Sequence, residues 1–550
     1  MAKDSVPVEK LEPSYLDVST NKYKTGILSW ILSVDHKRIG ILYLFSMMAF
    51  FIVAVFFGFL IRLELLSPGK TIVDAQTYNQ LFTLHGLIMI FLFIIPGLPA
   101  VFGNFFLPIM IGAKDVIFPR LNLMSWYMFA IGGLLAVTSI FLPGGSADTG
   151  WMFYVPYSIR TTTNVSPALL AAFILGFSSI LTGLNFITTI HRMRAPGMSW
   201  FKMPLFVWSL YATGWVQILA TPIIGITLAL VAIERFLGVG IFDPALGGDP
   251  VLYQHLFWIY SHPAVYIMIL PAMGIVSEII PTFSRRSIFG YKFIAFSSLA
   301  IALFGSLVWA HHMFTAGMSD TAQFVFSFIT YVVSIPSAIK VFNWLSTMYK
   351  GSIKADPPLL YVLSFIFQFS IGGFTGLMLG ALSVNIHLQD TSFVVAHFHY
   401  VMFGGTGFGI FAAMHYWFPK MFGRMYNLKV ATWGWGIVTF GYNLLYMPLF
   451  VMGYLGMPRR YYDYLPEFHT YHVVSTVGSW ILIIGLTVML TNLWVGMKRG
   501  KKAPMNPWGG ETLEWKIQTP PILENFHEIP DIHAGPYDYS KYEKAAKEAT

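Results

Sequence analysis

The chain has 550 residues and a formal net charge of +8; 56% of its residues are hydrophobic and only 11% are charged. Soluble domains carry about 25% charged residues, so too little polar surface is present to cover a water-exposed globule of this size. The composition predicts an all-α integral membrane protein and excludes a disordered chain, a coiled coil and a nucleic-acid-binding protein. Because the sequence contains no cysteine, any metal must be held by histidines, carboxylates or carbonyl groups.

Twelve apolar stretches follow one another along the chain, each bounded by charged residues, Pro or Gly. A helix needs about 20 apolar residues to cross the hydrocarbon of a bilayer, and every stretch reaches that length. The stretches cover residues 40–61, 80–108, 122–143, 165–189, 205–233, 253–280, 292–315, 322–346, 358–382, 392–417, 430–453 and 472–496. We predict one bundle of twelve transmembrane helices over residues 38–497, between a polar N-terminal segment (1–37) and a polar C-terminal tail (498–550).

The positive charges are distributed unequally between the two sides of this predicted bundle. Of the 34 Lys and Arg residues, 27 fall on the side of the N-terminus, six fall on the opposite side and Lys340 lies within the eighth stretch. Cytoplasmic loops keep the excess of positive charge. The count predicts that both termini are cytoplasmic, and the basic balance needs no acidic partner.

Six histidines lie in suggestive positions within the apolar stretches, where polar groups are costly and mark sites or pathways. They are His85, His262, His311, His312, His397 and His399. A lone histidine of this kind is more often a hydrogen-bonded core residue, but six of them, in two close pairs, favour metal ligation, because imidazole is the usual ligand of haem iron and copper.

The spacing of these histidines limits what they can bind. A helix turns about 100° per residue, so His397 and His399 point nearly opposite ways and must serve two different centres. His311 and His312 are adjacent and diverge by only about 100°, so both can reach one ion if a further ligand is present. His262 and Tyr266 stand four residues apart, on one face of a helix that Pro263 weakens.

Other polar residues at or near membrane depth are less specific. Lys340 lies in the middle of a stretch, and although its side chain could extend to the interface, Ser337 one turn earlier favours a polar route for protons. Asp115, on the cytoplasmic side, reads by itself as an ordinary loop aspartate.

Several motifs together resemble one known family. TLHGLIMIF, WIYSHPAVY, VWAHHMFTAGM, VVAHFHYVM and MPRRYYDY occur in family order and resemble subunit I of the haem-copper terminal oxidases, in the A-type branch typified by cytochrome c oxidase. The resemblance covers all twelve predicted spans, from Arg62 to Arg460. It implies two haems, one low-spin and one high-spin, with haem A in at least the high-spin site, and one copper ion.

The resemblance assigns a role to each ligand residue. It implies that His85 and His399 bind the low-spin haem, that His397 binds the high-spin haem, and that His262, His311 and His312 bind copper. Tyr266 resembles the tyrosine that is covalently linked to the copper-ligand histidine. Arg459 and Arg460 resemble the pair that binds haem propionates, and Arg62 resembles the arginine beside the low-spin haem.

The resemblance also implies two proton routes. Lys340 and Ser337 match the K channel. Asp115, Asn104 and Asn122 match the mouth of the D channel, and Ser178 and Ser179 match hydroxyl groups further along it.

Two departures from the family pattern stand out. The usual His-Pro-Glu-Val motif carries Ala264 in place of the glutamate, and Tyr260 and Ser261 precede it by about one turn, as in a sub-branch where a Tyr-Ser pair takes over the glutamate's place. With an ordinary pKa near 10, Tyr260 is a poor proton store and is expected to order water or to pass a proton transiently. Gln389-Asp390 stands where many members bind magnesium, and we do not expect that metal here.

The implied activity is reduction of O2 to water coupled to proton pumping, with electrons from cytochrome c. The expected partners are subunit II, which would carry the dinuclear copper that this cysteine-free chain cannot hold, subunit III, cytochrome c or an attached cytochrome c domain, and a respiratory supercomplex. The expected location is a bacterial inner membrane. The alternatives are a quinol oxidase, then a nitric oxide reductase, against which Tyr266 and Lys340 argue, and last a secondary transporter or proton channel.

Overall fold

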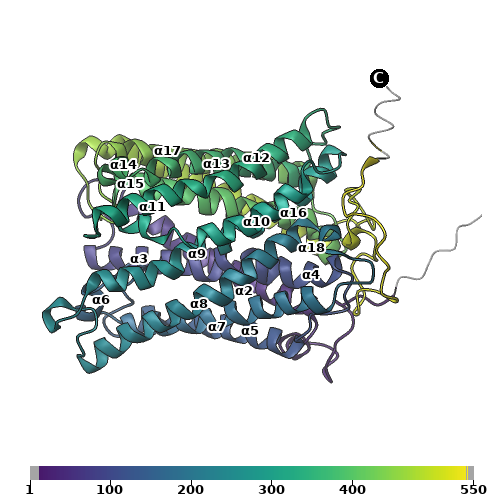
Figure 1. The fold of residues 1–550 in the computed structure, drawn as a ribbon, viewed down its shortest axis with the longest axis horizontal. Coiled ribbons are helices and arrows are strands. Elements are labelled where there is room, and N and C mark those ends of the chain that lie inside the picture. Colours follow the sequence, from purple (N-terminus) through teal and green to yellow (C-terminus); the bar gives the residue numbers. More distant parts are fainter. Residues whose placement is uncertain (1–11, 541, 543–550) are drawn as a thin grey trace, which may run out of the picture.

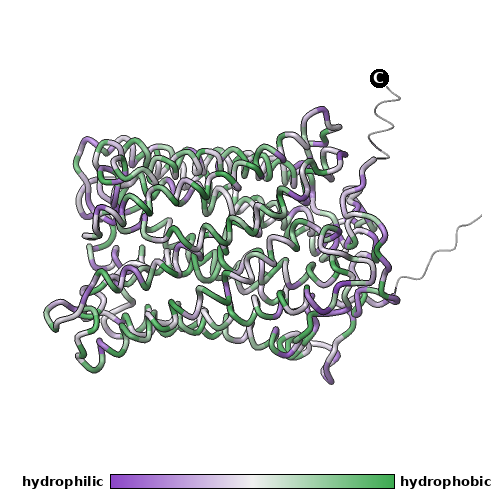
Figure 2. The backbone as a smooth tube through the Cα atoms, in the orientation of Figure 1, coloured by the Kyte–Doolittle hydropathy of each residue, from purple (hydrophilic) through white to green (hydrophobic). Residues whose placement is uncertain are grey.

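The long helices of the chain lie side by side in one bundle (Figure 1). The computed structural model describes residues 12–540 and 542, and within these residues it contains helices, loops and isolated bridges but no strand. Hydrophobic residues dominate the middle of the helices, whereas hydrophilic residues gather at their ends and in the terminal segments (Figure 2). This pattern is the one that a bilayer imposes, because only helices with internally satisfied backbones can cross its apolar interior.

Eleven helices of the described chain are long and apolar enough to cross a membrane, which confirms the all-helical membrane fold. Three of them are composite, because π-helical turns or a short break interrupt the α-helix. The eleven are α2 (His36–Glu64), α3 to α4 (Ala75–Met110), α5 with its 3-10 end (Pro119–Phe141), α7 (Val165–Arg192), α8 (Leu205–Leu237), α9 (Pro250–Ser284), α11 to α12 (Asp320–Met348), α13 (Pro357–Gly380), α15 to α16 (Ser392–Phe422), α17 (Leu428–Tyr454), and α18 with the 3-10 turn before it (Pro466–Arg499).

The composite spans consist of shorter elements. The parts are α3 (Ala75–Ile88), π turns at Met89–Ile94 and Gly97–Gly103, and α4 (Asn104–Met110); α11 (Asp320–Val332) and α12 (Ser334–Met348); and α15 (Ser392–Val401), a π turn at Met402–Gly407 and α16 (Phe408–Phe422). Short helices outside the spans are α1 (Ile27–Ile31), α6 (Tyr157–Arg160) and α14 (Leu382–Leu388).

The seventh predicted stretch, 292–315, differs from the prediction. It forms α10 (Tyr291–Gly305), which has 15 residues, and then a 3-10 turn over Trp309–Met313 that carries His311 and His312. Gly305 disfavours continuation of the helix, and the hydroxyl of Ser306 bonds back to the carbonyl of Ala302 at 2.7 Å. The α-helical angle expected between the two histidines is therefore wrong, since a 3-10 helix turns about 120° per residue.

The core of the bundle is built around α9. All of its residues from Ile267 to Ser284 are buried, and it packs against α8, α10, α12, α13 and α16. Its central place explains why this helix has an apolar surface all round, a pattern that marks a fully enclosed helix.

Both terminal segments pack against the same end of the bundle, at the right of Figure 1. A bridge joins Ser14 to Ile522, and the Tyr15 hydroxyl donates to the carbonyl of Met421 at 2.7 Å. Several tail side chains are almost fully buried, namely Trp508, Glu514, Trp515, Asn525 and Tyr539. The predicted polar tail is thus packed onto the bundle over its described length; residues 1–11, 541 and 543–550 of the predicted polar ends lie outside the described residues.

Candidate functional site

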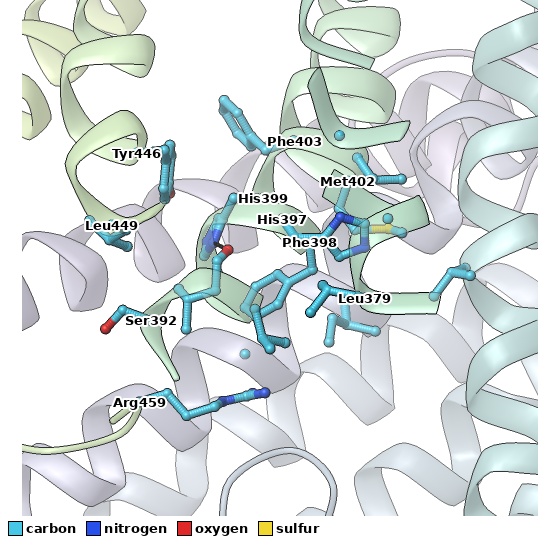
Figure 3. Close-up of a pocket in the computed structure, with 18 of the residues that line it drawn as sticks. Leu379, Ser392, His397, Phe398, His399, Met402, Phe403, Tyr446, Leu449 and Arg459 are labelled. Atoms are coloured by element: carbon cyan, nitrogen blue, oxygen red, sulfur yellow. Dashed lines mark hydrogen bonds between the residues drawn. The ribbon is translucent and has the colours of Figure 1, made fainter. Parts of the chain in front are cut away.

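A cavity of about 1080 Å³ lies within the bundle, and all six singled-out histidines line it. It is larger than ordinary ligand pockets, which measure about 300–1,000 Å³. Figure 3 shows part of its wall, with His397 and His399 on α15 and Arg459 on the loop after α17. The other predicted residues that line it are Tyr266, Ser337, Arg62 and Arg460.

Three imidazoles converge at one place in this cavity. His262 comes from α9, and His311 and His312 come from the 3-10 turn; one nitrogen of each lies within 4.8 Å of the others. Nδ1 of His262 is 3.0 Å from Nε2 of His312, and Nδ1 of His311 is 3.1 Å from the Thr330 hydroxyl, which leaves Nε2 of His311 for another partner. Three convergent imidazole nitrogens without a thiolate are a donor set that fits copper.

A row of aromatic side chains on α9 supports this cluster. The Tyr266 ring lies 4.9 Å from the His262 ring, centroid to centroid, and Nε2 of His262 is buried with no hydrogen-bond partner within the described chain. On the other side of His262, Trp258 stacks on His312 at 3.8 Å and donates from Nε1 to the Tyr154 hydroxyl at 2.6 Å. Trp258 was not predicted as a site residue, although it stands four residues before His262 in the sequence.

The rings of His397 and His399 lie on opposite sides of α15 (Figure 3), as the two-residue spacing predicts. Nδ1 of His399 donates to the Val395 carbonyl at 2.8 Å, and Nδ1 of His397 is 3.2 Å from the Thr375 hydroxyl. Each ring therefore keeps Nε2 for the cavity, which is the arrangement that orients a metal-ligating histidine.

His85 has the same arrangement on α3, since its Nδ1 donates to the Ala54 carbonyl at 2.8 Å. Glycines leave room for two of the imidazoles. A Cβ on Gly58 would come within 3.1 Å of the His85 ring, and one on Gly376 would come within 2.9 Å of the His397 ring. The positions of His85, His397 and His399, their free Nε2 atoms and the space beside two of the rings therefore fit the binding of haem iron.

Two arginines, Arg459 and Arg460, bring positive charge to the wall of the cavity. Burial and the neighbouring Arg460 lower the pKa of Arg459 to about 10. The Asp390 carboxylate lies 3.9 Å from Arg459, whose Nε is buried without a partner in the described chain. A buried guanidinium group with an unused N–H donor suits a carboxylate of a bound group.

Arg62 lies at another wall of the cavity. It donates from Nη2 to the carbonyl of His472 at 2.8 Å and to the Thr476 hydroxyl at 2.9 Å. The His472 ring stacks on Tyr464 at 3.9 Å and is buried. His472 therefore helps to hold Arg62 in place.

Lys340 is buried on α12, and its ammonium donates to the Ser298 hydroxyl on α10 at 2.7 Å. Ser298 could not be predicted from local spacing, since it lies 42 residues from Lys340. Ser337 donates to the Val333 carbonyl at 3.1 Å and lines the cavity, whereas its predicted companion Lys340 points to α10.

Asp115 lies in the loop between α4 and α5, near buried polar groups. Burial and the Asp35 carboxylate raise the pKa of Asp115 to about 8. Further in, Asn104 and Asn122 are fully or almost fully buried; Oδ1 of Asn104 and both amide atoms of Asn122 have no partner in the described chain. Buried polar atoms of this kind are normally satisfied by ordered water.

Buried hydroxyl groups also lie on α2, α5, α7 and α9. Tyr43 donates to Ser125 at 2.9 Å and lies 3.1 Å from the Ser178 hydroxyl. The hydroxyls of Ser179 and Ser261 are buried without a partner in the described chain. Tyr260 is buried on α9 beside Ser261.

His255 and Gln389 each contact the 3-10 turn that carries His311 and His312. Nδ1 of His255 accepts a hydrogen bond from Nε1 of Trp309 at 3.3 Å. Gln389 donates to the His312 carbonyl at 3.4 Å, and the Asp390 side chain beside it is 66% exposed.

Comparisons with known proteins agree with this geometry. The sequence matches the family model described as Cytochrome C and Quinol oxidase polypeptide I over residues 38–481. It is 43% identical over 507 residues to a cytochrome c oxidase subunit 1 of Synechocystis sp., with 92% of each chain covered. It is 39% identical over 536 residues to that of Cereibacter sphaeroides, covering 91% of this chain and 95% of the relative. A solved structure of a heme-copper terminal oxidase dimer is similar in fold, with a TM-score of 0.67, 20% identity and 85% of each chain covered.

Proposed function

Because the chain belongs to the cytochrome c and quinol oxidase polypeptide I family, we propose that it is the catalytic subunit of a respiratory terminal oxidase. This subunit reduces O2 to water with electrons from cytochrome c and couples the reaction to proton pumping. One observation carries the proposal: three imidazole nitrogens converge within 4.8 Å in the cavity that His397 also lines.

Each ligand group has a proposed occupant. His85 and His399 bind a low-spin haem, His397 binds a high-spin haem with the substituents of haem A, and His262, His311 and His312 bind copper. Bound together, these groups supply electron transfer and the redox chemistry of oxygen reduction. The protein fixes their positions, because each haem-binding ring has its Nδ1 engaged by a carbonyl or hydroxyl group.

The chain's own residues hold the site and deliver protons. Arg459 and Arg460 bind haem propionates, and Arg62 lies beside the low-spin haem. The Tyr266 phenol holds a proton next to His262, and Lys340 moves protons toward it from the Ser298 side, past Ser337.

A second route takes up protons at Asp115. It passes Asn104 and Asn122 and the hydroxyls of Ser178 and Ser179, and it ends at Tyr260 and Ser261 in place of the glutamate that Ala264 replaces. The buried amide and hydroxyl groups without protein partners support this route, because they can order water between them.

The proposed assembly places the chain in a bacterial inner membrane with both termini cytoplasmic. α10 supplies the twelfth span; at about 1.5 Å per residue its 15 residues cover only part of the hydrocarbon, and the turn with His311 and His312 extends it. Subunit II with a dinuclear copper site, subunit III, and cytochrome c or an attached cytochrome c domain are the partners, within a respiratory supercomplex.

The topology has a simple test, because the chain contains no cysteine. Lys502→Cys and Ala245→Cys each place one thiol at an exposed position, on the tail and on the loop between α8 and α9. An impermeant maleimide should label the Ala245 variant in intact cells and the Lys502 variant only after lysis. The reverse pattern would overturn the proposed orientation.

Metal content of the purified holoenzyme tests the function itself. Two irons and three coppers per chain are expected for a cytochrome c oxidase with its copper-bearing partner. Two irons and one copper would favour a quinol donor, which the family also includes. Three irons without copper would indicate nitric oxide reduction, and folded protein without either metal would indicate a transporter.

A further inference from the structure

A turn of the C-terminal tail reaches the place where the proposed route through Asp115 begins. The turn spans residues 522–526 and is tied to the N-terminal segment by the Ser14 to Ile522 bridge. Asn525 lies at its centre; only 2% of the residue is exposed, and its backbone is left-handed at φ 64°, a conformation that asparagine tolerates better than most residues. The tail thus inserts a buried amide between the start of α2 and the loop after α4.

The Asn525 side chain uses both ends of its amide. Its Nδ2 donates to the carbonyls of Ala113 at 2.9 Å and Lys114 at 3.1 Å, and lies 2.9 Å from Nε2 of His36. Its Oδ1 accepts from the Lys37 ammonium at 2.8 Å. One side chain of the tail therefore joins the loop that carries Asp115 to the first two residues of α2.

The Lys37 ammonium has three close oxygen acceptors, which matches its three N–H groups. They are Oδ2 of Asp35 at 2.8 Å, the Leu523 carbonyl at 2.7 Å and Oδ1 of Asn525. Lys37 is fully buried, and two of these three oxygen atoms belong to the tail. The tail thereby fixes the position of a cation whose charge lowers the pKa of Asp115.

The environment of Asp115 depends on these contacts. The titratable groups around it are Asp35, His36 and Lys37 at the start of α2, Lys114 on its own loop, and Glu524 on the tail. Burial and the Asp35 charge raise the pKa of Asp115, and the Lys37 charge opposes them. Lys114 and Glu524 form an exposed ion pair at 2.7 Å, which adds little holding energy.

We propose that Asn525 is a positioning residue of the proton-uptake site: it clamps the loop before Asp115 and holds the Lys37 ammonium in place at the start of α2. The inference rests on the proposed function, in which Asp115 takes up protons. Asn525 itself transfers no proton. It sets the burial and the charge balance under which Asp115 gains and loses its proton.

Two substitutions at Asn525 should move Asp115 in opposite directions. Asn525→Leu removes the contacts to Ala113, Lys114 and Lys37, so the loop opens and water reaches Asp115. The pKa of Asp115 should fall, because burial is the largest influence on it and outweighs the smaller, opposing effect of a displaced Lys37 charge. Asn525→Asp keeps an acceptor for Lys37 but adds a second negative charge, which raises the pKa of a neighbouring carboxyl group. A merely structural role would lower stability in both variants without opposite shifts.

The experiment is the pH profile of oxygen consumption by the assembled oxidase in proteoliposomes. The alkaline limb is expected to move to lower pH by about one unit in Asn525→Leu and to higher pH by a similar amount in Asn525→Asp. Asn506→Leu is the matched control, because this tail asparagine bonds only to Gly509 and Gly510 among the described contacts. The low-spin haem spectrum and thermal inactivation of each variant report folding.

The same variants in an Asp115→Asn background separate the possible failures. Opposite shifts that vanish in this background support the inference. If the pH profiles of the Asn525 variants are unshifted while Asp115→Asn still removes the alkaline limb, the role of Asn525 is overturned and the proposed route remains intact. An Asp115→Asn enzyme with the unchanged wild-type profile overturns proton uptake at Asp115, and the inference with it.

Discussion

Replacing Gly305 with alanine should displace the Tyr266 ring and slow oxygen reduction. Gly305 is the last residue of α10, and its backbone lies against the face of Tyr266. A Cβ at Gly305 would lie 2.4 Å from Cδ2, 2.5 Å from Cε2 and 2.9 Å from Cγ of this ring. Carbon atoms pack at about 3.5–4.0 Å, so the ring would have to retreat by about 1 Å.

The size of the effect follows from this displacement. Overpacking of a close-packed interior costs about 1–3 kcal/mol, so we expect the variant to fold with reduced stability. A displacement of about 1 Å in a reacting group lowers rates by about 10²-fold. Because the Tyr266 phenol is proposed to hold a proton beside His262, turnover should fall by about this factor while the low-spin haem spectrum is retained.

Steady-state oxygen consumption of the purified oxidase measures the loss. Gly436→Ala is the matched control, since a Cβ at this helical glycine of α17 meets nothing within 4 Å. Copper and iron contents of both variants show whether the site is still filled. A Gly305→Ala enzyme that retains full stability and the wild-type rate would refute the placement of Tyr266 against α10.

Four further substitutions test other parts of the site. Lys340→Met should slow oxygen consumption by about 10²–10⁴-fold, the usual range for a lost proton-transfer group, and a normal rate would contradict the proposed route. Ser298→Ala removes the hydroxyl bonded to Lys340, a contact to a charged group worth about 1.5–3 kcal/mol, and should give an intermediate rate in the same assay. His262→Ala should lose copper in metal analysis and keep the low-spin haem spectrum. Proton uptake should decline as the pH rises through about 8, where Asp115 gives up its proton, and Asp115→Asn should remove this decline as followed with a pH-indicator dye.

Much of the fold and of the candidate site could be predicted from local sequence patterns. The twelve apolar stretches predicted the spans, and eleven of them form long apolar helices. The divergence of His397 and His399 followed from helix geometry alone. The assignment of each histidine to a particular haem or to copper came from the resemblance, because spacing fixes directions but not which metal is bound.

Other features could not be predicted because they depend on distant contacts. The close approach of Tyr266 to Gly305 comes from another helix, and no local pattern records it. Ser298 meets Lys340 across 42 residues, and Asn525 meets Lys37 across 488. Trp258 is a different case. Its four-residue spacing from His262 is visible in the sequence, but this spacing alone does not mark it as a site residue.

The position of His397 and His399 on one turn of α15 has a mechanical consequence. Within an α-helix, two residues this close are held by the same few backbone hydrogen bonds, so their separation is as stiff as the turn itself. A shift of α15 relative to its neighbours moves both rings together. The distance that an electron must cross between the two proposed haem sites should therefore change little when the helices of the bundle move. Regulation of the enzyme should act on proton delivery, where loops, the tail and long side chains can shift, rather than on this fixed gap.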